Sequence, residues 1–66
     1  MKATPIYIQI QTEQDGSTSV FYGLQNQLEW IATFASYYDA RCCALEIQSD
    51  TGGEIIDMTR IKRKAA

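Results

Sequence analysis

The residues that could carry chemistry in this chain are acids, serines and a pair of cysteines. The 66-residue sequence contains eight aspartate and glutamate residues, two cysteines and no histidine. The serines therefore lack the imidazole base that usually activates a serine nucleophile. Asp50 could form an acid–base pair with Glu54 or Asp57 only if burial perturbed a pKa, and we expect these three residues in a turn and on a solvent face. The sequence predicts no catalytic residue and a protein that is not an enzyme.

The adjacent cysteines Cys42 and Cys43 suggest a metal site or a redox switch. A structural zinc site needs four ligands, which two neighbouring thiols cannot supply in a chain without histidine. A disulfide between neighbours would be strained. We therefore expect reduced thiols, no metal and no cofactor, with Cys43 acting as a small apolar residue. The sequence shows no signal-peptide pattern and no long apolar segment, which favours a cytoplasmic protein without a membrane partner.

Charge divides the chain into an acidic body and a basic end. Residues 1–59 hold all eight acids and, as basic residues, only Lys2 and Arg41. Residues 60–66 hold no acid, and their four basic side chains are Arg60, Lys62, Arg63 and Lys64. We expect residues 1–59 to form a single domain and residues 60–66 to form a basic tail. The tail could contact phosphates with a salt-dependent affinity, although a solvated terminus explains the same pattern.

Only Asn26–Asp39 has the pattern of a helix. Asn26 is a favoured N-cap residue, and Glu29 completes an approximate capping box. The apolar side chains would cover roughly 220° of the helix surface at about 100° per residue. A surface helix buries a stripe of only about 100° or somewhat more. The excess is aromatic and consists of Trp30, Phe34 and Tyr37.

The segments before this helix alternate with the period of two that is typical of half-buried strands. Asp15-Gly16 between them is a strong hairpin signal, because both residues tolerate positive φ. A two-residue loop would place Phe21 opposite Ile10. In that register Phe21 is buried, whereas Tyr22 joins Tyr7 on the outer face of the sheet.

The segments after the helix form a second hairpin in this interpretation, with strands at residues 42–48 and 55–60. Ile56 and Met58 would then face the core and Ile55 the outer face. The predicted fold is α+β, a two-layer β-β-α-β-β domain in which one helix packs on an antiparallel sheet.

The aromatic stripe of Trp30, Phe34 and Tyr37 is the strongest functional candidate. Aromatic residues are enriched in binding hot spots, and an uncovered apolar patch usually marks a contact surface. A core of this size rarely supplies more than about 3–5 kcal/mol, so a partner chain is a common source of stability. We expect a homodimer or the capture of another protein, with Tyr7 and Tyr22 as further contacts. Alternatively, the stripe is the flank of a broad core whose tryptophan and tyrosine side chains place their polar ends in water.

The whole chain is very short, acidic and free of histidine, and the predicted helix opens with Leu28-Glu29-Trp30. In size and element order it resembles the small accessory proteins of phages and mobile elements, among them some anti-CRISPR proteins and phage-encoded toxin inhibitors. The resemblance implies stoichiometric binding to a host protein without catalysis, and no functional residue is carried over from it.

The sequence therefore favours a small non-enzymatic protein-binding module. The alternative is a nucleic-acid-binding or regulatory module that uses the basic tail. Tyr7 and Tyr22 could stack bases on the sheet, as aromatic residues do in some RNA-binding proteins. However, Glu46 and Asp57 are expected on the same face and would repel a polyanion.

Overall fold

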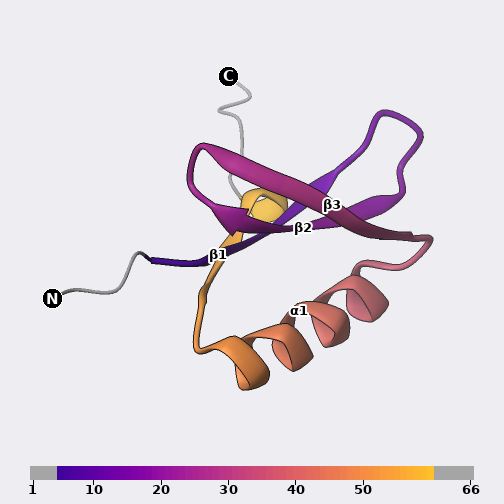
Figure 1. Ribbon diagram of the computed structural model, residues 1–66. Coiled ribbons are helices and arrows are strands. Elements are labelled where there is room, and N and C mark those ends of the chain that lie inside the picture. The colour runs from indigo at the N-terminus through magenta and orange to yellow at the C-terminus, as the bar shows by residue number, and fades with distance from the viewer. Residues whose placement is uncertain (1–4, 61–66) are drawn as a thin grey trace, which may run out of the picture.

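The computed structural model describes residues 5–60 of the chain (Figure 1). Its elements in chain order are β1 (Tyr7–Thr12), β2 (Thr18–Leu24), β3 (Gln27–Phe34), the helix α1 (Tyr37–Thr51), β4 (Glu54–Asp57) and a short 3-10 helix, η1 (Met58–Arg60). The four strands form one sheet in the order β3-β2-β1-β4, and α1 packs against one face of it. The predicted two-layer α+β fold with one helix is confirmed, although the element order is β-β-β-α-β and the sheet is mixed.

β1 and β2 form the predicted hairpin with a longer loop than expected. Gly16 lies in the turn with a φ of 92°, and Asp15 Oδ1 accepts a hydrogen bond from the Ser17 N–H at 3.0 Å. The strand pairing closes at Thr12 and Thr18, which leaves five residues in the loop instead of two. The predicted register is therefore wrong by one residue.

This shift exchanges the two faces of β2. Val20, not Phe21, lies opposite Ile10, and Val20 is fully buried. Phe21 consequently lies on the face of the sheet away from α1, which we call the outer face. Tyr22 lies on the helix side and packs against the core, so its predicted place on the outer face beside Tyr7 is wrong.

The predicted helix Asn26–Asp39 is wrong, because most of this segment is β3. Half of β3 consists of aromatic or β-branched residues, which favour strands: Trp30, Ile31, Thr33 and Phe34. The pairing with β2 shifts between Val20 and Phe21, and the resulting bulge leaves Ile31 without a partner residue on β2.

The turn between β2 and β3 runs through Gln25 and Asn26, and Leu24 pairs directly with Gln27. Gly23 permits this close return of the chain. Its φ is 145°, and a Cβ at this position would lie 2.5 Å from the Gln27 carbonyl oxygen. Asn26, expected to cap a helix, is thus a hairpin residue, a second role that asparagine commonly has.

α1 begins only after Ser36, whose side-chain oxygen accepts a hydrogen bond from the Tyr38 N–H at 3.1 Å. Gly52 ends the helix in the left-handed conformation with a φ of 74°, and its N–H donates to the Gln48 carbonyl at 2.7 Å. The predicted strand at residues 42–48 is therefore wrong.

Two patterns overlap in this part of the sequence. An alternation of period two is formed by Cys43, Leu45 and Ile47. The spacing of i, i+3, i+4 and i+7, which is typical of a helix, is formed by Ala40, Cys43, Ala44 and Ile47. The second set faces the core, whereas Leu45 is exposed. The helical signal was present and was masked by the alternation.

β4 pairs with β1 in parallel and forms no hairpin with the segment before it. Ile55 lies beside Ile8 and Ile56 beside Gln9, so Ile55 faces the core and Ile56 the outer face. Both assignments reverse the prediction, and Met58, expected to face inward, is exposed in η1. Parallel strands require a crossover connection, and α1 provides it between β3 and β4.

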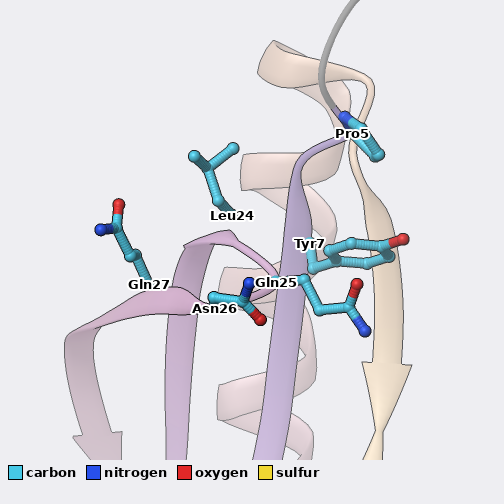
Figure 2. A pocket seen from close by; sticks show the side chains of 6 residues that line it. All are labelled: Pro5, Tyr7, Leu24, Gln25, Asn26 and Gln27. Carbon is cyan, nitrogen blue, oxygen red and sulfur yellow. The ribbon is translucent and has the colours of Figure 1, made fainter.

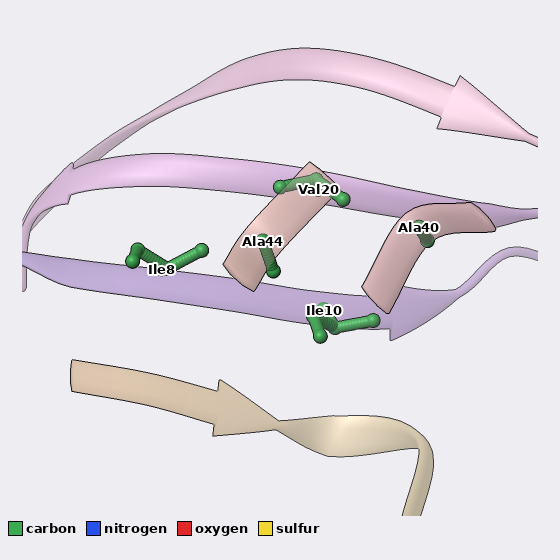
Figure 3. Packing of buried hydrophobic residues seen from close by; sticks show 5 residues of the cluster. All are labelled: Ile8, Ile10, Val20, Ala40 and Ala44. Atoms are coloured by element: carbon green, nitrogen blue, oxygen red, sulfur yellow. The ribbon is translucent and has the colours of Figure 1, made fainter. Parts of the chain in front are cut away.

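The core lies between α1 and the sheet. Figure 3 shows its fully buried members, which are Ile8, Ile10, Val20, Ala40 and Ala44. The helix contributes only alanines to this set, so its backbone can approach the sheet closely while the branched strand residues fill the space between. Residues 5–60 contain no second α-helix, and the core therefore occupies only one side of the sheet.

A hydrogen-bond cluster around Asp57 joins the start of α1 to the end of β4. The Tyr37 hydroxyl donates to Asp57 Oδ2 at 2.5 Å, and the Thr59 N–H and hydroxyl donate to Oδ1 at 3.1 and 2.5 Å. Arg41 Nη1 lies 4.0 Å from Oδ2. The Asp57 side chain is only 14% exposed, so these bonds replace most of its contact with water.

Replacing Tyr37 with phenylalanine should destabilise the protein by about 1.5–3 kcal/mol, since it removes a hydrogen bond to a largely buried carboxylate. Tyr38→Phe is the matched control, because Tyr38 is the next residue of the helix and is 75% exposed. Urea unfolding of both variants measures the difference. Equal free energies of unfolding for the two variants would show that the Tyr37–Asp57 bond does not hold the helix to the sheet.

Candidate functional site

The residues considered for chemistry do not assemble into a reactive centre in the part of the chain that the structure describes. Among residues 5–60 no group of three or more histidine, cysteine or acidic residues is placed to hold a metal ion. Cys42 and Cys43 are free thiols. Partial burial, with a smaller contribution from Glu46, raises the pKa of the Cys43 thiol, which lowers its thiolate fraction and its reactivity.

The structure separates the three residues of the predicted aromatic stripe. Trp30 and Phe34 belong to β3, and Tyr37 is the first residue of α1. Phe34 and Tyr37 pack against the core on the helix side. Trp30 pairs with Phe21 and lies on the outer face, where it is 59% exposed. The predicted common surface for these three residues is therefore wrong, and only Trp30 is available on the open side of the sheet.

The other predicted contact residues are separated in the same way. Tyr7 lies on the outer face as expected, whereas Tyr22 pairs with Ile8 and faces the helix. Of the predicted nucleic-acid-binding residues, Lys62, Arg63 and Lys64 lie outside the described residues. Arg60 is the last residue of η1.

Strand pairing identifies the residues that share the outer face. Positions directly opposite each other in a sheet place their side chains on the same face, and the pairs run from Glu54 and Ile56 on β4, through Tyr7 and Gln9 on β1, to Phe21 on β2 and Leu28 and Trp30 on β3. α1 lies on the opposite side of the sheet (Figure 1). The large apolar side chains of this open face are Tyr7, Phe21, Leu28, Trp30 and Ile56.

A polar strip crosses this face along β1. The Gln9 amide Nε2 donates to Gln11 Oε1 at 2.9 Å, and Gln11 Nε2 donates to Glu13 Oε2 at 3.3 Å. Phe21 and Trp30 lie on one side of the strip and Ile56 on the other. The face therefore combines apolar side chains with polar groups in fixed orientations, a composition typical of protein interfaces.

Two hollows lie at the end of the sheet where β1 begins, and both include Tyr7 and Gln25. One, with a volume of about 350 Å³, is formed by Pro5, Tyr7 and the turn at residues 24–27 (Figure 2). The other, of about 360 Å³, also includes Gln9, Leu28, Glu54 and Ile56. In Figure 2 the Tyr7 ring extends from β1 across β4. This end of the outer face is therefore concave, and a side chain of a partner could occupy either hollow.

Trp30 is held in a defined orientation although it is exposed. Its indole Nε1–H donates to Thr33 Oγ1 at 2.8 Å, and Thr33 Oγ1 is in turn 2.8 Å from the Ser19 hydroxyl. Ser19 is only 1% exposed, so this chain of bonds is anchored in the sheet. Because its polar group already has a partner within the protein, the exposed part of the side chain is the apolar ring.

Sequence reasoning missed Phe21, Leu28 and Ile56 as members of this face. Phe21 was assigned to the core through a wrong register, Ile56 through a hairpin that does not form, and Leu28 was placed on a helix. A hydrophobic alternation does not say which of its two faces is covered. Only the length of the β1–β2 loop, which sets the register, could have corrected the assignment of Phe21.

Asp15 lies at the opposite end of the face, in the β1–β2 turn. Its Oδ1 accepts hydrogen bonds from the Ser17 hydroxyl at 2.6 Å and from the Ser17 N–H at 3.0 Å. These two bonds, the hydroxyl bond first, lower the pKa of the Asp15 carboxyl below its ordinary value of 3.8. The carboxylate therefore stays ionised throughout the neutral range and well into the acidic range.

Ser17→Ala should raise the pKa of Asp15 toward 3.8, because it removes the larger of the two causes of the shift. The folded-state pKa lies below the unfolded value, so the contribution of Asp15 to stability is complete above the unfolded pKa and disappears as the pH falls through the folded one. NMR titration of the Asp15 carboxyl carbon in both proteins measures the effect. An unchanged midpoint in Ser17→Ala would show that the turn does not hold the carboxylate in this way.

No helix in the described part of the chain is both long and apolar enough to cross a membrane. Comparisons of the sequence with protein-family models and with curated proteins, and of the structure with solved structures, found no match. The functional interpretation therefore depends on the geometry of the outer sheet face.

Proposed function

We propose that this protein is a small non-enzymatic protein-binding module and that the outer face of its sheet is the binding surface. The observation that carries the proposal is Trp30, which is 59% exposed although its indole N–H is already bonded to Thr33. Binding hot spots are enriched in tryptophan, and this tryptophan is ordered, exposed and located beside other apolar side chains. A partner would cover Trp30 together with Phe21 and Leu28.

The partner is a second copy of the chain, a different protein, or each in turn. The core of the described part of the chain is small and one-sided, with five fully buried apolar residues, and domains of this size commonly gain stability by association. Stoichiometric inhibition of a host protein, which the resemblance to phage accessory proteins implies, is one form of this function. Of the features behind that resemblance, the short acidic chain without histidine remains, whereas the element order and the helix opening at Leu28 do not. The free cysteines are compatible with a cytoplasmic setting.

Binding of nucleic acid is less well supported. Arg41 is the only lysine or arginine among residues 5–59, and it lies on α1 beside Asp57. Glu13 and Glu54 border the outer face, so the aromatic side chains there lack the positive charge that a polyanion requires. A nucleic-acid-binding function would have to use residues 60–66.

Trp30→Ser should weaken association by about 2 kcal/mol or more, the usual cost of truncating a hot-spot residue, while the fold is retained. Tyr38→Ser is the matched control, since it removes an even more exposed aromatic residue from the helix side. Sedimentation equilibrium over a wide concentration range measures self-association, and quantitative capture from host lysate compares other partners across the three proteins.

The proposal predicts that Tyr38→Ser behaves as the wild type and that Trp30→Ser loses the dimer or a specific captured protein. If wild type and Trp30→Ser have the same mass at every concentration and capture the same proteins in the same amounts, the outer face is not the binding surface.

A further inference from the structure

A third hollow lies at the end of the outer face where the β1–β2 turn projects. It has a volume of about 690 Å³ and is open to solvent, and the residues around it are Glu13, Gln14, Asp15, Ser17, Ser19, Trp30 and Thr33. The turn contributes the acidic side of this hollow, and β3 contributes the aromatic side. This pairing of an indole ring with two carboxylates is not used by the fold, because the core lies on the other side of the sheet.

We propose that this hollow, which we call the Trp30 hollow, binds an arginine side chain of a basic segment on a partner protein. A guanidinium is attracted to the face of a tryptophan ring and pairs with carboxylates through two parallel hydrogen bonds. Arginine is the one common side chain that suits both the aromatic and the acidic side of the hollow, since its guanidinium is flat enough to stack and carries a permanent charge. The inference rests on the proposed protein-binding function and names the chemistry of the partner.

Trp30, on the aromatic side of the hollow, is preorganised for such a ligand. The bond from the Trp30 indole N–H to Thr33 fixes the ring before any ligand arrives, which reduces the entropy lost on binding. The same bond occupies the polar edge of the indole, so the ring presents its apolar, electron-rich face.

The two carboxylates on the acidic side of the hollow can still accept hydrogen bonds. Asp15 Oδ1 accepts both bonds from Ser17, and Oδ2 accepts none from another residue among residues 5–60. Glu13 accepts only one long hydrogen bond through its side chain, from Gln11 at 3.3 Å. Both carboxylates therefore keep acceptor positions for a donor from outside.

The charge of residues 5–59 favours a basic partner over other ligands. Residues 5–59 hold all eight acids and one basic residue, Arg41, which is engaged near Asp57 on the helix side. No lysine or arginine in this range can fill the Trp30 hollow from its own side of the sheet. The field at the hollow therefore attracts cations and repels phosphate groups.

The experiment uses the full chain, labelled with ¹⁵N, and the capped tripeptide acetyl-Gly-Arg-Gly-amide as the probe. The control peptide replaces arginine with citrulline, which has the same shape and no charge. The expected result is saturable shifts of the Trp30 indole signal and of the Asp15 and Ser17 amides with the arginine peptide only, weakened by added salt.

Three variants locate the site. Trp30→Leu should weaken binding of the arginine peptide by roughly two- to five-fold, the size of an exposed cation–π contact. The double variant Glu13→Gln, Asp15→Asn removes both charges, while the side-chain amide introduced in the turn retains an oxygen that can hold Ser17. This double variant should abolish the difference between arginine and citrulline. Tyr38→Leu, on the helix, should bind as the wild type does.

Equal shifts with the citrulline peptide, or full binding by the double variant, would overturn the arginine site. If oligothymidylate shifted the Trp30, Asp15 and Ser17 signals and the arginine peptide did not, the arginine site would also be overturned, in favour of base stacking. Each of these failures leaves the sheet face as a possible protein surface. Failure of the proposed function itself is recognised separately, by the unchanged association of Trp30→Ser.

Discussion

The rest of the structure depends on the contact between one helix and one face of a four-stranded sheet. Ala40 and Ala44 bring α1 close to Ile8, Ile10 and Val20, and these five residues are the fully buried core. Once they fix which face of each strand is covered, alternation sends every second side chain to the other face. For this reason Tyr7, Phe21, Leu28, Trp30 and Ile56 lie on the open face, where Trp30 is exposed and the other four are half-buried. The open face is thus a direct consequence of having only one α-helix among residues 5–60 to cover a two-sided sheet.

The connections of the sheet determine where charge meets this surface. The β1–β2 turn carries Glu13 and Asp15 past the end of β3, so the acids lie around the same hollow as Trp30. On the other side of the sheet, the crossover through α1 brings β4 next to β1, and the Tyr37–Asp57 bond fastens the start of the helix to the end of that strand. The single basic residue among positions 5–59, Arg41, is held on this helix side. Within residues 5–59 the outer face therefore combines apolar area with negative charge that no basic side chain of this range offsets, a combination that would suit the proposed basic partner.

Part of the fold could be predicted from the sequence, because some strong local signals agree with it. The alternation at the start of the chain and Asp15-Gly16 identify the first hairpin, and the small α+β class follows from the mixture of periods. The position of the helix could not be predicted as easily. Trp30 and Phe34 lie four residues apart, which fits a helix, while their types favour a strand. The hairpin turn at residues 25–26, which Gly23 permits, decides between the two. The sequence of β4 does not show that this strand pairs in parallel, since parallel and antiparallel strands share a period of two. Exposure of Trp30 was expected from an excess of apolar helix surface, whereas the structure places it on a strand with one open face.

The measurement that tests this account most directly is a proton NOE map of the Trp30 indole in dilute protein. The account predicts contacts from the indole to Thr33 and Phe21 across the outer face, and none to the methyl groups of Ala40 and Ala44 on α1. Strong contacts between the indole and those two alanines would place Trp30 in the core, and the proposal of an open, partner-binding sheet face would then be contradicted.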